Sequence, residues 1–308
     1  FRHAFRAPAG SIGRRAGQRE NSMPGYVLAA VLFAALLHAS WNALAKGRAT
    51  GADAGDPLVR AAMIAAGGAV AALPLIAYGG IPASASWPYL VASIFIHVIY
   101  FILVGMTRRG ADLGVVYPLT RGAAPLGVAL AGYLLIGEAL TAAGWAGVLV
   151  LGAGIVTLGS DALRRRGLDV RSAGLVALNA SVIVAYTLID GAGVRLSGNP
   201  AGYIGWLMFG TGAGLFPVVS ALLPDAFRQQ MRARWRFGLA GGAMLTASYG
   251  IALWAMTKAP IAAVSAARET SVLFAAIIGA VFLGERLGHA GLAGAALIGA
   301  GLVLLRLA

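Results

Sequence analysis

One stretch of the sequence occurs twice, and this repeat constrains the fold more than any other feature. Residues 116–138 read VYPLTRGAAPLGVALAGYLLIGE, and residues 263–285 read AVSAARETSVLFAAIIGAVFLGE. Each copy is an apolar run with one arginine that closes on Gly-Glu. The same offset of 147 residues relates identical residues of the two copies, among them these seven pairs: Arg121 and Arg268, Gly137 and Gly284, Glu138 and Glu285, Gly144 and Gly291, Gly147 and Gly294, Gly152 and Gly299, Gly154 and Gly301. The chain therefore consists of one unit used twice.

The composition indicates a membrane protein. Of the 308 residues, 59% are hydrophobic and only 11% are charged, whereas a soluble domain carries about 25% charged residues. A membrane-spanning helix needs about 20 predominantly apolar residues. Ten segments meet this requirement, at about 26–45, 58–78, 87–106, 111–136, 142–159, 172–189, 201–222, 236–256, 260–283 and 288–306. The sequence predicts an all-α membrane protein with ten transmembrane helices.

The most polar internal connection divides these helices into two groups of five. It covers residues 160–171 and reads SDALRRRGLDVR. We expect a first repeat at residues 26–159 and a second at residues 172–306. A second copy that enters after five crossings lies upside down relative to the first, so the repeats are predicted to be inverted. Residues 1–25 are predicted to be a disordered tail, with Met23 as a natural start.

The positive charges predict an orientation. The connections after the first, third, fifth, seventh and ninth segments hold 13 Lys and Arg residues, and the opposite connections hold 3. When the N-terminal tail is counted with the opposite connections, the difference narrows to 13 Lys and Arg residues against 8. Because Lys and Arg favour the cytoplasmic side, we expect the linker in the cytoplasm and both termini outside. An excess of Arg over Lys, with much Ala and Gly, is typical of a GC-rich bacterial gene, and the expected location is the inner membrane.

The net charge and the absence of cysteine exclude several classes of function. The formal charge of +13 lies in short clusters between apolar runs, so membrane topology explains it without a nucleic-acid partner. With no cysteine, disulfides, cysteine-ligated zinc and thiol nucleophiles are excluded. No metal-ligand spacing or phosphate-binding loop is present, because GTGAG at residues 210–214 lies within a span and follows no strand. We expect no cofactor and no metal, and as partners a small-molecule substrate and membrane lipid, with the chain a monomer or homodimer.

The two repeated arginines are the first candidates for a substrate site. An arginine inside a span is costly and marks a site, a water-filled path or a buried ion pair. Because the repeats are inverted, Arg121 and Arg268 should approach the midplane from opposite faces, where repeat transporters bind substrate. The alternative is a structural pair, and Glu269 is the obvious partner for Arg121. Glu269 and His38 are also candidates for proton coupling.

Prolines and glycines add a further expectation. Pro118 and Pro125 bracket Arg121 and predict a bent helix beside the charge. Glu138, after Gly137, is expected to complement the dipole of the next helix. The glycines of the fifth and tenth segments predict close helix packing, with Gly291, Ala295 and Gly299 forming a small-xxx-small row.

Polar and aromatic residues gather at matching places in the two halves. The first segment carries HASWNALAK at residues 38–46, and the sixth carries NASVIVAYTLID at residues 179–190. Candidate cavity-lining residues are His38, Trp41, Asn42, Tyr117, Asn179 and Tyr186. Trp41, Lys46 and Asp190 are equally suited to anchor helices at the membrane interface, and His97 suits a packing role.

The repeated unit resembles the EamA domains of the drug/metabolite transporter superfamily. The resemblance is carried by YLLIGEALTAAGWAGVLVLGAGIVTLG at residues 133–159 and AVFLGERLGHAGLAGAALIGAGLVLL at residues 280–305. It covers residues 24–306 and implies a cavity between two halves that move in alternating access. YPLTRG and ARETSVLF also resemble a subset with arginines in these helices, some of whose members are associated with phosphonates. Many members of the family lack these arginines.

These observations predict a secondary transporter for a small anionic or zwitterionic metabolite, such as an amino acid, organic acid or phosphonate, and not an enzyme. The competing hypotheses are an intramembrane lipid-modifying enzyme, which would need a catalytic cluster such as Ser/His/Asp that the spans do not suggest, and a channel or non-transporting subunit.

Overall fold

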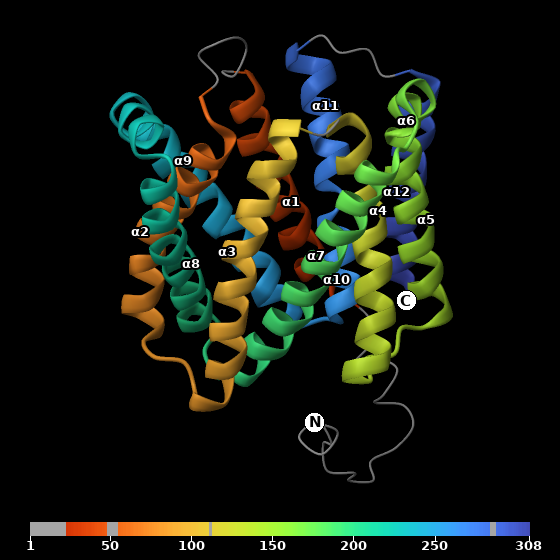
Figure 1. Cartoon of the computed structure of the whole chain (residues 1–308). Coiled ribbons are helices and arrows are strands. Elements are labelled where there is room, and N and C mark those ends of the chain that lie inside the picture. Colours follow the sequence, from red (N-terminus) through yellow and green to blue (C-terminus); the bar gives the residue numbers. More distant parts are fainter. Residues whose placement is uncertain (1–22, 48–54, 111–112, 284–287) are drawn as a thin grey trace, which may run out of the picture.

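A computed structural model describes residues 23–47, 55–110, 113–283 and 288–308. In these ranges the chain is helical and contains no strand. The elements, which Figure 1 labels, run in the order: α1 (Gly25–Gly47), α2 (Pro57–Gly79), a 3₁₀ turn η2 (Ser84–Ser86), α3 (Trp87–Gly110), α4 (Leu113–Ala131), a π-helical turn η3 (Gly132–Ile136), α5 (Ala142–Leu158), α6 (Ser160–Arg166), α7 (Val170–Leu196), α8 (Pro200–Leu222), α9 (Pro224–Met256), α10 (Ile261–Arg268), α11 (Ser271–Leu283) and α12 (His289–Leu307).

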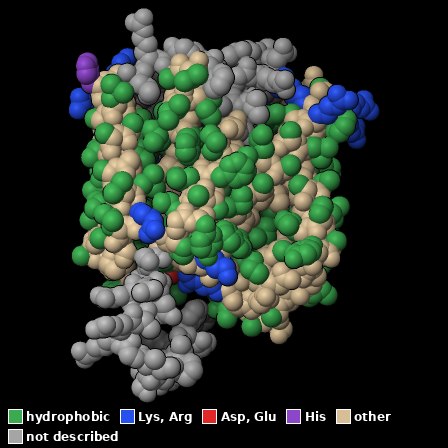
Figure 2. Space-filling model, turned by 180° about the vertical axis from the view of Figure 1, so that it is seen from behind, with side chains coloured by type: hydrophobic (Ala, Val, Ile, Leu, Met, Phe, Trp, Pro, Cys, Tyr) green, Lys and Arg blue, Asp and Glu red, His purple; other side chains and the backbone are tan. Residues whose placement is uncertain are grey.

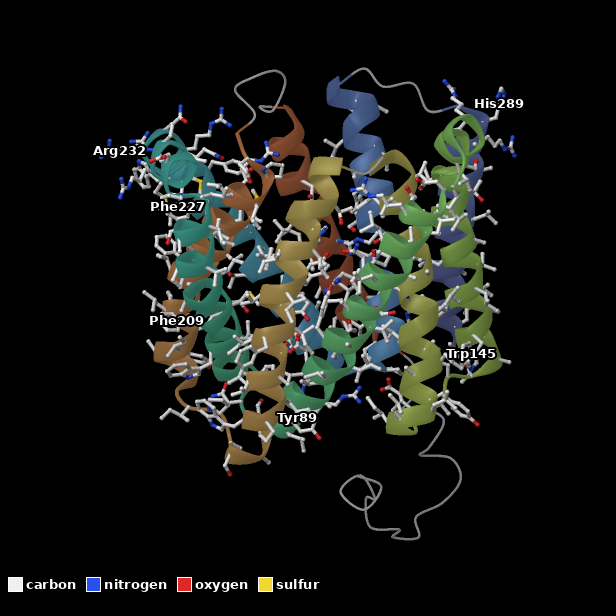
Figure 3. The ribbon with its side chains drawn as sticks, viewed as in Figure 1. Tyr89, Trp145, Phe209, Phe227, Arg232 and His289 are labelled. Carbon is white, nitrogen blue, oxygen red and sulfur yellow. The ribbon has the colours of Figure 1, made fainter. Side chains whose placement is uncertain are left out.

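The protein is a multi-pass membrane protein. Within the described ranges, 8 helical segments are long and apolar enough to cross a membrane, and Gly25–Ser40 and Ala142–Leu158 are shorter apolar helices. Large apolar side chains such as Phe95, Leu135 and Val281 are exposed on the flanks, and Figure 2 shows these flanks covered mainly by hydrophobic side chains. Arg232 and His289 lie at one end of the bundle and Tyr89 lies at the other (Figure 3). The apolar flank between two polar ends fits a bilayer.

Short polar residues begin several of these helices. The Asp56 carboxylate accepts hydrogen bonds from the backbone N–H groups of Leu58 and Val59, at 2.8 and 3.3 Å, and Pro57 opens α2. Asn199 caps α8 in the same way, and Pro200 follows it. A capping side chain and a proline in the first turn both stabilise a helix start. The sequence signals at these positions therefore locate the helix boundaries.

Four details differ from the expected segments. The connection at residues 160–171 contains the short helix α6. α9 begins at Pro224, well before residue 236, and its backbone leaves helical geometry at Arg234, where φ is −139° and ψ is 21°. Helical structure runs through Pro118 and Pro125 in α4, whereas the second copy is interrupted between α10 and α11. Of the tail predicted at residues 1–25, residues 1–22 lie outside the described ranges, Met23 is buried and α1 begins at Gly25.

Glycines let equivalent helices of the two halves pack closely. A Cβ on Gly147 would lie 3.0 Å from the Gly301 carbonyl oxygen, and a Cβ on Gly301 would lie 2.9 Å from that of Gly147. The same reciprocal contact joins Gly154 and Gly294, at 2.9 and 2.8 Å. These pairs make α5 and α12 antiparallel neighbours. The predicted row through Gly299 is wrong, because a Cβ on Gly299 would meet nothing within 4 Å.

Candidate functional site

The two repeated arginines and Glu269 lie together in the interior. Nη1 of Arg121 donates to both carboxylate oxygens of Glu269, at 3.0 and 3.1 Å. Nη2 of Arg268 lies 4.0 Å from Glu269 Oε1, which is beyond hydrogen-bond distance. Arg121, Arg268 and Glu269 are 5, 7 and 1% exposed. One carboxylate therefore lies between two buried guanidinium groups but hydrogen-bonds only one of them.

An interruption in the second copy positions this carboxylate. α10 ends at Arg268, and α11 begins at Ser271. Between them, the N–H groups of Glu269 and Thr270 bond carbonyls three residues back, Ala266 and Ala267, at 3.0 and 3.2 Å. The Thr270 hydroxyl also donates to the Ala267 carbonyl, at 2.8 Å. This tight turn places consecutive charged residues within the candidate span Ile261–Val281. Such breaks are tolerated where they are buried in protein or line a cavity.

Two adjoining cavities meet at Arg121. The first, which we call the Arg268 cavity, is lined by both arginines together with His38, His97, Tyr186 and Tyr249. The second, the Asn179 cavity, is lined by Arg121 together with His38, Asn42, Tyr117, Thr120 and Asn179. Tyr100, Phe101 and Leu245 line both cavities. Helices from both halves of the chain form the walls, so the cavities lie between the halves.

The predicted candidates mostly lie at these cavities. Asn42, Tyr117 and Asn179 line the Asn179 cavity, and Tyr186 lines the Arg268 cavity. His38 lines both, and its Nε2 lies 3.1 Å from Nη2 of Arg121. Glu269 is buried behind the arginines and does not line either cavity. Trp41 lies in α1, but its side chain is outside the described part of the structure.

The Asn179 cavity lies toward the face that carries α6. Asn179 is nine residues after the start of α7, and Tyr117 is four residues after the start of α4. The wall of the Asn179 cavity includes the hydroxyl-bearing residues Thr107 and Thr120. The Thr120 hydroxyl, like that of Thr211 in the Arg268 cavity, is buried and has no hydrogen-bond partner among the described residues. Buried hydroxyls without a protein partner suit a cavity that receives a polar solute.

A second polar cluster adjoins the Arg268 cavity and was not predicted. Asp190 is 0% exposed, so it does not anchor α7 at an interface. Its carboxylate accepts hydrogen bonds from the hydroxyls of Tyr203 and Tyr249, at 3.1 and 2.5 Å. His97 Nε2 lies 3.9 Å from Asp190 Oδ2, and His97 Nδ1 lies 3.0 Å from both Oγ and the carbonyl of Ser93. We call these five residues the Asp190 cluster.

The Asp190 cluster contains a Ser/His/Asp set, which the sequence did not suggest. Ser93 is 0% exposed and lines neither cavity. Ser93 lies one helical turn before His97 in α3, and its hydroxyl faces the imidazole ring of His97. A nucleophile must reach its substrate, and this serine is packed away from the cavities.

A third polar cluster lies at the opposite end of the protein. Glu138, after η3, pairs with Arg195 near the end of α7 at 2.9 Å, and its second oxygen accepts from the backbone N–H of Ile261 at 2.8 Å. Arg195 also donates to the carbonyls of Met256 and Ala259, at 2.7 and 2.9 Å. We call these five residues the latch. Glu138 thus complements the start of α10, in the other half, rather than the helix that follows it. Its repeat counterpart, Glu285, lies outside the described residues.

Comparison with known proteins identifies the family. Residues 171–307 match the EamA-like transporter family. The matched residues make up most of the second half of the chain, which is therefore an EamA-like domain. The EamA resemblance seen in the sequence is therefore confirmed. No curated protein matches the chain.

Solved structures support the fold. Twenty-four solved chains match this chain. One of them, a crystal structure, superposes with a TM-score of 0.72 over 91% of this chain and 96% of the other, at 19% sequence identity. At this identity the similarity describes the architecture alone. It shows that the arrangement of helices is shared over nearly the whole of both chains.

Proposed function

We propose that this EamA protein is a secondary transporter that moves a small anionic or zwitterionic metabolite by alternating access. The observation that carries the proposal is a pair of buried arginines where two cavities meet between the halves of the chain. A buried charge in a span is costly unless it has a function or a partner. Here Glu269 satisfies Arg121, and Arg268 has no carboxylate within hydrogen-bond distance among the described residues.

Arg268 is the group best suited to bind the substrate. Its guanidinium lies 5.2 Å from the ring centre of Tyr249, on the wall of the Arg268 cavity. A guanidinium can bind a carboxylate or a phosphonate through two parallel hydrogen bonds, and this contact is strong where water is scarce. An amino acid, an organic acid and a phosphonate all carry such a group. Tyr186 and Tyr249 would then cover the apolar part of the solute.

We infer that the two halves are inverted repeats with ten crossings in total. The reciprocal contacts of Gly147 with Gly301 and of Gly154 with Gly294 support this, because an axis in the membrane plane exchanges one pair for the other. The interruption between α10 and α11 supports it as well, since repeat transporters bind substrate at discontinuous helices near the midplane. Ten crossings require the shorter apolar helices Gly25–Ser40 and Ala142–Leu158 to span the bilayer.

Alternating access requires one end to be closed while the other is open. The latch ties Glu138 of the first half to Arg195 and Ile261 of the second. Arg195 and Asn179 are 16 residues apart in α7, about 24 Å along the helix. The latch and the Asn179 cavity therefore lie toward opposite faces. In this conformation the substrate would leave or enter past Asn179 while the latch holds the other end closed.

The proposed setting is the inner membrane of a bacterium, with the α6 face in the cytoplasm. Arg164 and Arg165 of α6 are exposed at this face, and so is Arg232 of α9. Exposed arginines on the cytoplasmic side follow the positive-inside rule. The protein would act as a monomer or homodimer. Chemical catalysis in the membrane is less favoured, because Ser93 lies apart from the cavities and no cluster of potential metal ligands occurs among the described residues.

Counterflow in proteoliposomes tests the proposed function. Liposomes loaded with unlabelled L-alanine, succinate or aminoethylphosphonate are diluted into the same labelled solute. We expect transient, saturable accumulation of at least one of the three, and its loss in Arg268→Ala. Arg306→Ala removes an exposed arginine near the end of α12 and serves as the control. Counterflow that is unaffected by Arg268→Ala would contradict the role of Arg268, and uptake without saturation would indicate a channel.

A further inference from the structure

The Asp190 cluster joins four helices around one carboxylate. Asp190 lies in α7, His97 in α3, Tyr203 in α8 and Tyr249 in α9. Both tyrosine hydroxyls donate to the carboxylate. His97 presents Nε2 to Asp190 at 3.9 Å, because its Nδ1 faces Ser93. Two titratable groups, a carboxylate and an imidazole, therefore face each other just beyond hydrogen-bond distance in the interior.

Protons can reach this pair from the Arg268 cavity. Asp190 itself is 0% exposed, but His97 and Tyr249 line the cavity. The ring of His97 packs on that of Tyr186 at 4.5 Å and on that of Tyr249 at 5.4 Å. His97 thus has one nitrogen directed toward Asp190 and belongs to the wall where the substrate would bind. Imidazole is the side chain best suited to pass a proton near neutral pH.

The charges of the interior link this pair to the substrate. Among the described residues, four buried side chains are charged in their usual states: Arg121, Arg268, Glu269 and Asp190. Two positive and two negative charges cancel. An anionic substrate whose carboxylate or phosphonate binds Arg268 would add a negative charge to this core. A net charge in a water-poor interior is costly, and one proton on Asp190 or His97 restores neutrality.

We propose that Asp190 and His97 form the proton-binding site that couples this protein to a proton gradient. The coupling rests on the proposed transport function, whereas proton binding by Asp190 does not. Asp190 takes the proton, His97 passes it from the cavity, and Tyr203 and Tyr249 hold the carboxyl group in place. The charged group that faces the cluster from α10 is Arg268, which lies over the ring of Tyr249. An anion at Arg268 screens its positive charge from Asp190 and favours protonation.

Infrared spectroscopy on the protein in lipid tests proton binding without a substrate. Spectra are recorded between pH about 5 and about 9, where ordinary Asp and Glu side chains stay largely ionised. We expect a pH-dependent band from the C=O stretch of a protonated carboxyl group, which is lost in Asp190→Asn. The band should remain in Glu269→Gln and in the control Asp169→Asn, which changes an exposed acid at the start of the same helix. A band that survives Asp190→Asn, or no pH-dependent band in the wild type, would overturn the proposal.

Transport measurements test the coupling itself. With a solute that shows counterflow, we expect an inward proton gradient to drive accumulation in the wild type. Asp190→Asn should keep counterflow and lose this accumulation. If Asp190→Asn still accumulates solute, or if the wild type ignores the gradient, the coupling inference fails although the transporter proposal stands. If none of L-alanine, succinate and aminoethylphosphonate shows counterflow, the transporter proposal fails for these solutes, and the infrared result still decides proton binding by Asp190.

Discussion

Arg121 and Glu269 are 148 residues apart in the sequence and form a doubly hydrogen-bonded ion pair in the interior. The pair joins α4 of the first half to the interruption in the second. Its partners are 5 and 1% exposed, so the ion pair is largely shielded from bulk water.

We predict that Glu269→Gln destabilises the protein by about 3–5 kcal/mol, because it leaves a buried guanidinium without its counter-charge. The measurement is thermal or denaturant unfolding in detergent. Arg121→Met together with Glu269→Gln should recover part of the loss, since removing both charges avoids an uncompensated one. Additive effects of the two substitutions would show that the ion pair does not contribute as described.

The latch should control access to its end of the protein. Because this sequence has no cysteine, a single cysteine introduced into it can be labelled without background. Val194, next to Arg195, is 1% exposed. We expect Glu138→Gln to raise the rate of maleimide labelling at Val194→Cys several-fold.

Ser84→Cys provides the control for this measurement. Ser84 is exposed in η2, which contacts α7, and its labelling rate should not change with Glu138→Gln. If Val194→Cys and Ser84→Cys respond equally, or if neither responds, Glu138 does not hold this end closed.

The α5–α12 contact allows a matched pair of substitutions. A Cβ at Gly154 would lie 2.8 Å from the backbone N of Ile298 and 2.9 Å from the Gly294 carbonyl oxygen, so Gly154→Ala forces the two helices apart. Overpacking of this kind costs about 1–3 kcal/mol. Gly299→Ala introduces the same methyl group into open space. We expect unfolding measurements to show a loss for Gly154→Ala only, and equal stability of the two variants would argue against the close contact.

The start of α7, outside the membrane-spanning part, predicts that the stability of the protein depends on pH. Hydrogen bonds from the side chain and backbone of Ser172 lower the pKa of Asp169 from its model-compound value of 3.8. Because the pKa of Asp169 is lower in the folded protein, its carboxylate stabilises the fold above pH 3.8. This stabilisation is lost as the pH falls through the pKa of Asp169 in the folded state. In Asp169→Asn the cap remains but the charge does not. The wild type should be slightly more stable than Asp169→Asn at neutral pH and equal to it in strong acid, and a difference independent of pH would contradict this.

The sequence predicted the membrane fold and much of the candidate site. Apolar length locates the helices, because the bilayer fixes how long an apolar segment must be. The constant offset of the repeat identified Arg121 and Arg268, and Glu269 was recognised as a partner because it is the acid next to Arg268. These inferences depend on local spacing, which the sequence displays directly.

The Asp190 cluster and the latch could not be predicted, because both depend on helix rotation and on contacts between distant segments. Asp190 is near the end of an apolar run, where an acid usually meets the interface, but α7 continues to Leu196 and turns this carboxylate inward. Glu138 complements the N-terminus of α10, which is distant in sequence, rather than that of α5. The available signal for Asp190 was that uncharged residues, GAGV at residues 191–194, follow it before the next basic residue.

A ligand-induced thermal-shift screen tests the central claim most directly. The purified protein is mixed separately with L-alanine, succinate and aminoethylphosphonate, and its unfolding temperature is compared with that of Arg121→Ala, Arg268→Ala and the control Arg306→Ala. A ligand that binds only the folded state raises this temperature as its concentration rises. The account predicts a concentration-dependent rise with at least one of these solutes in the wild type and in Arg306→Ala, and no rise in Arg268→Ala. An equal rise in Arg268→Ala would contradict the account.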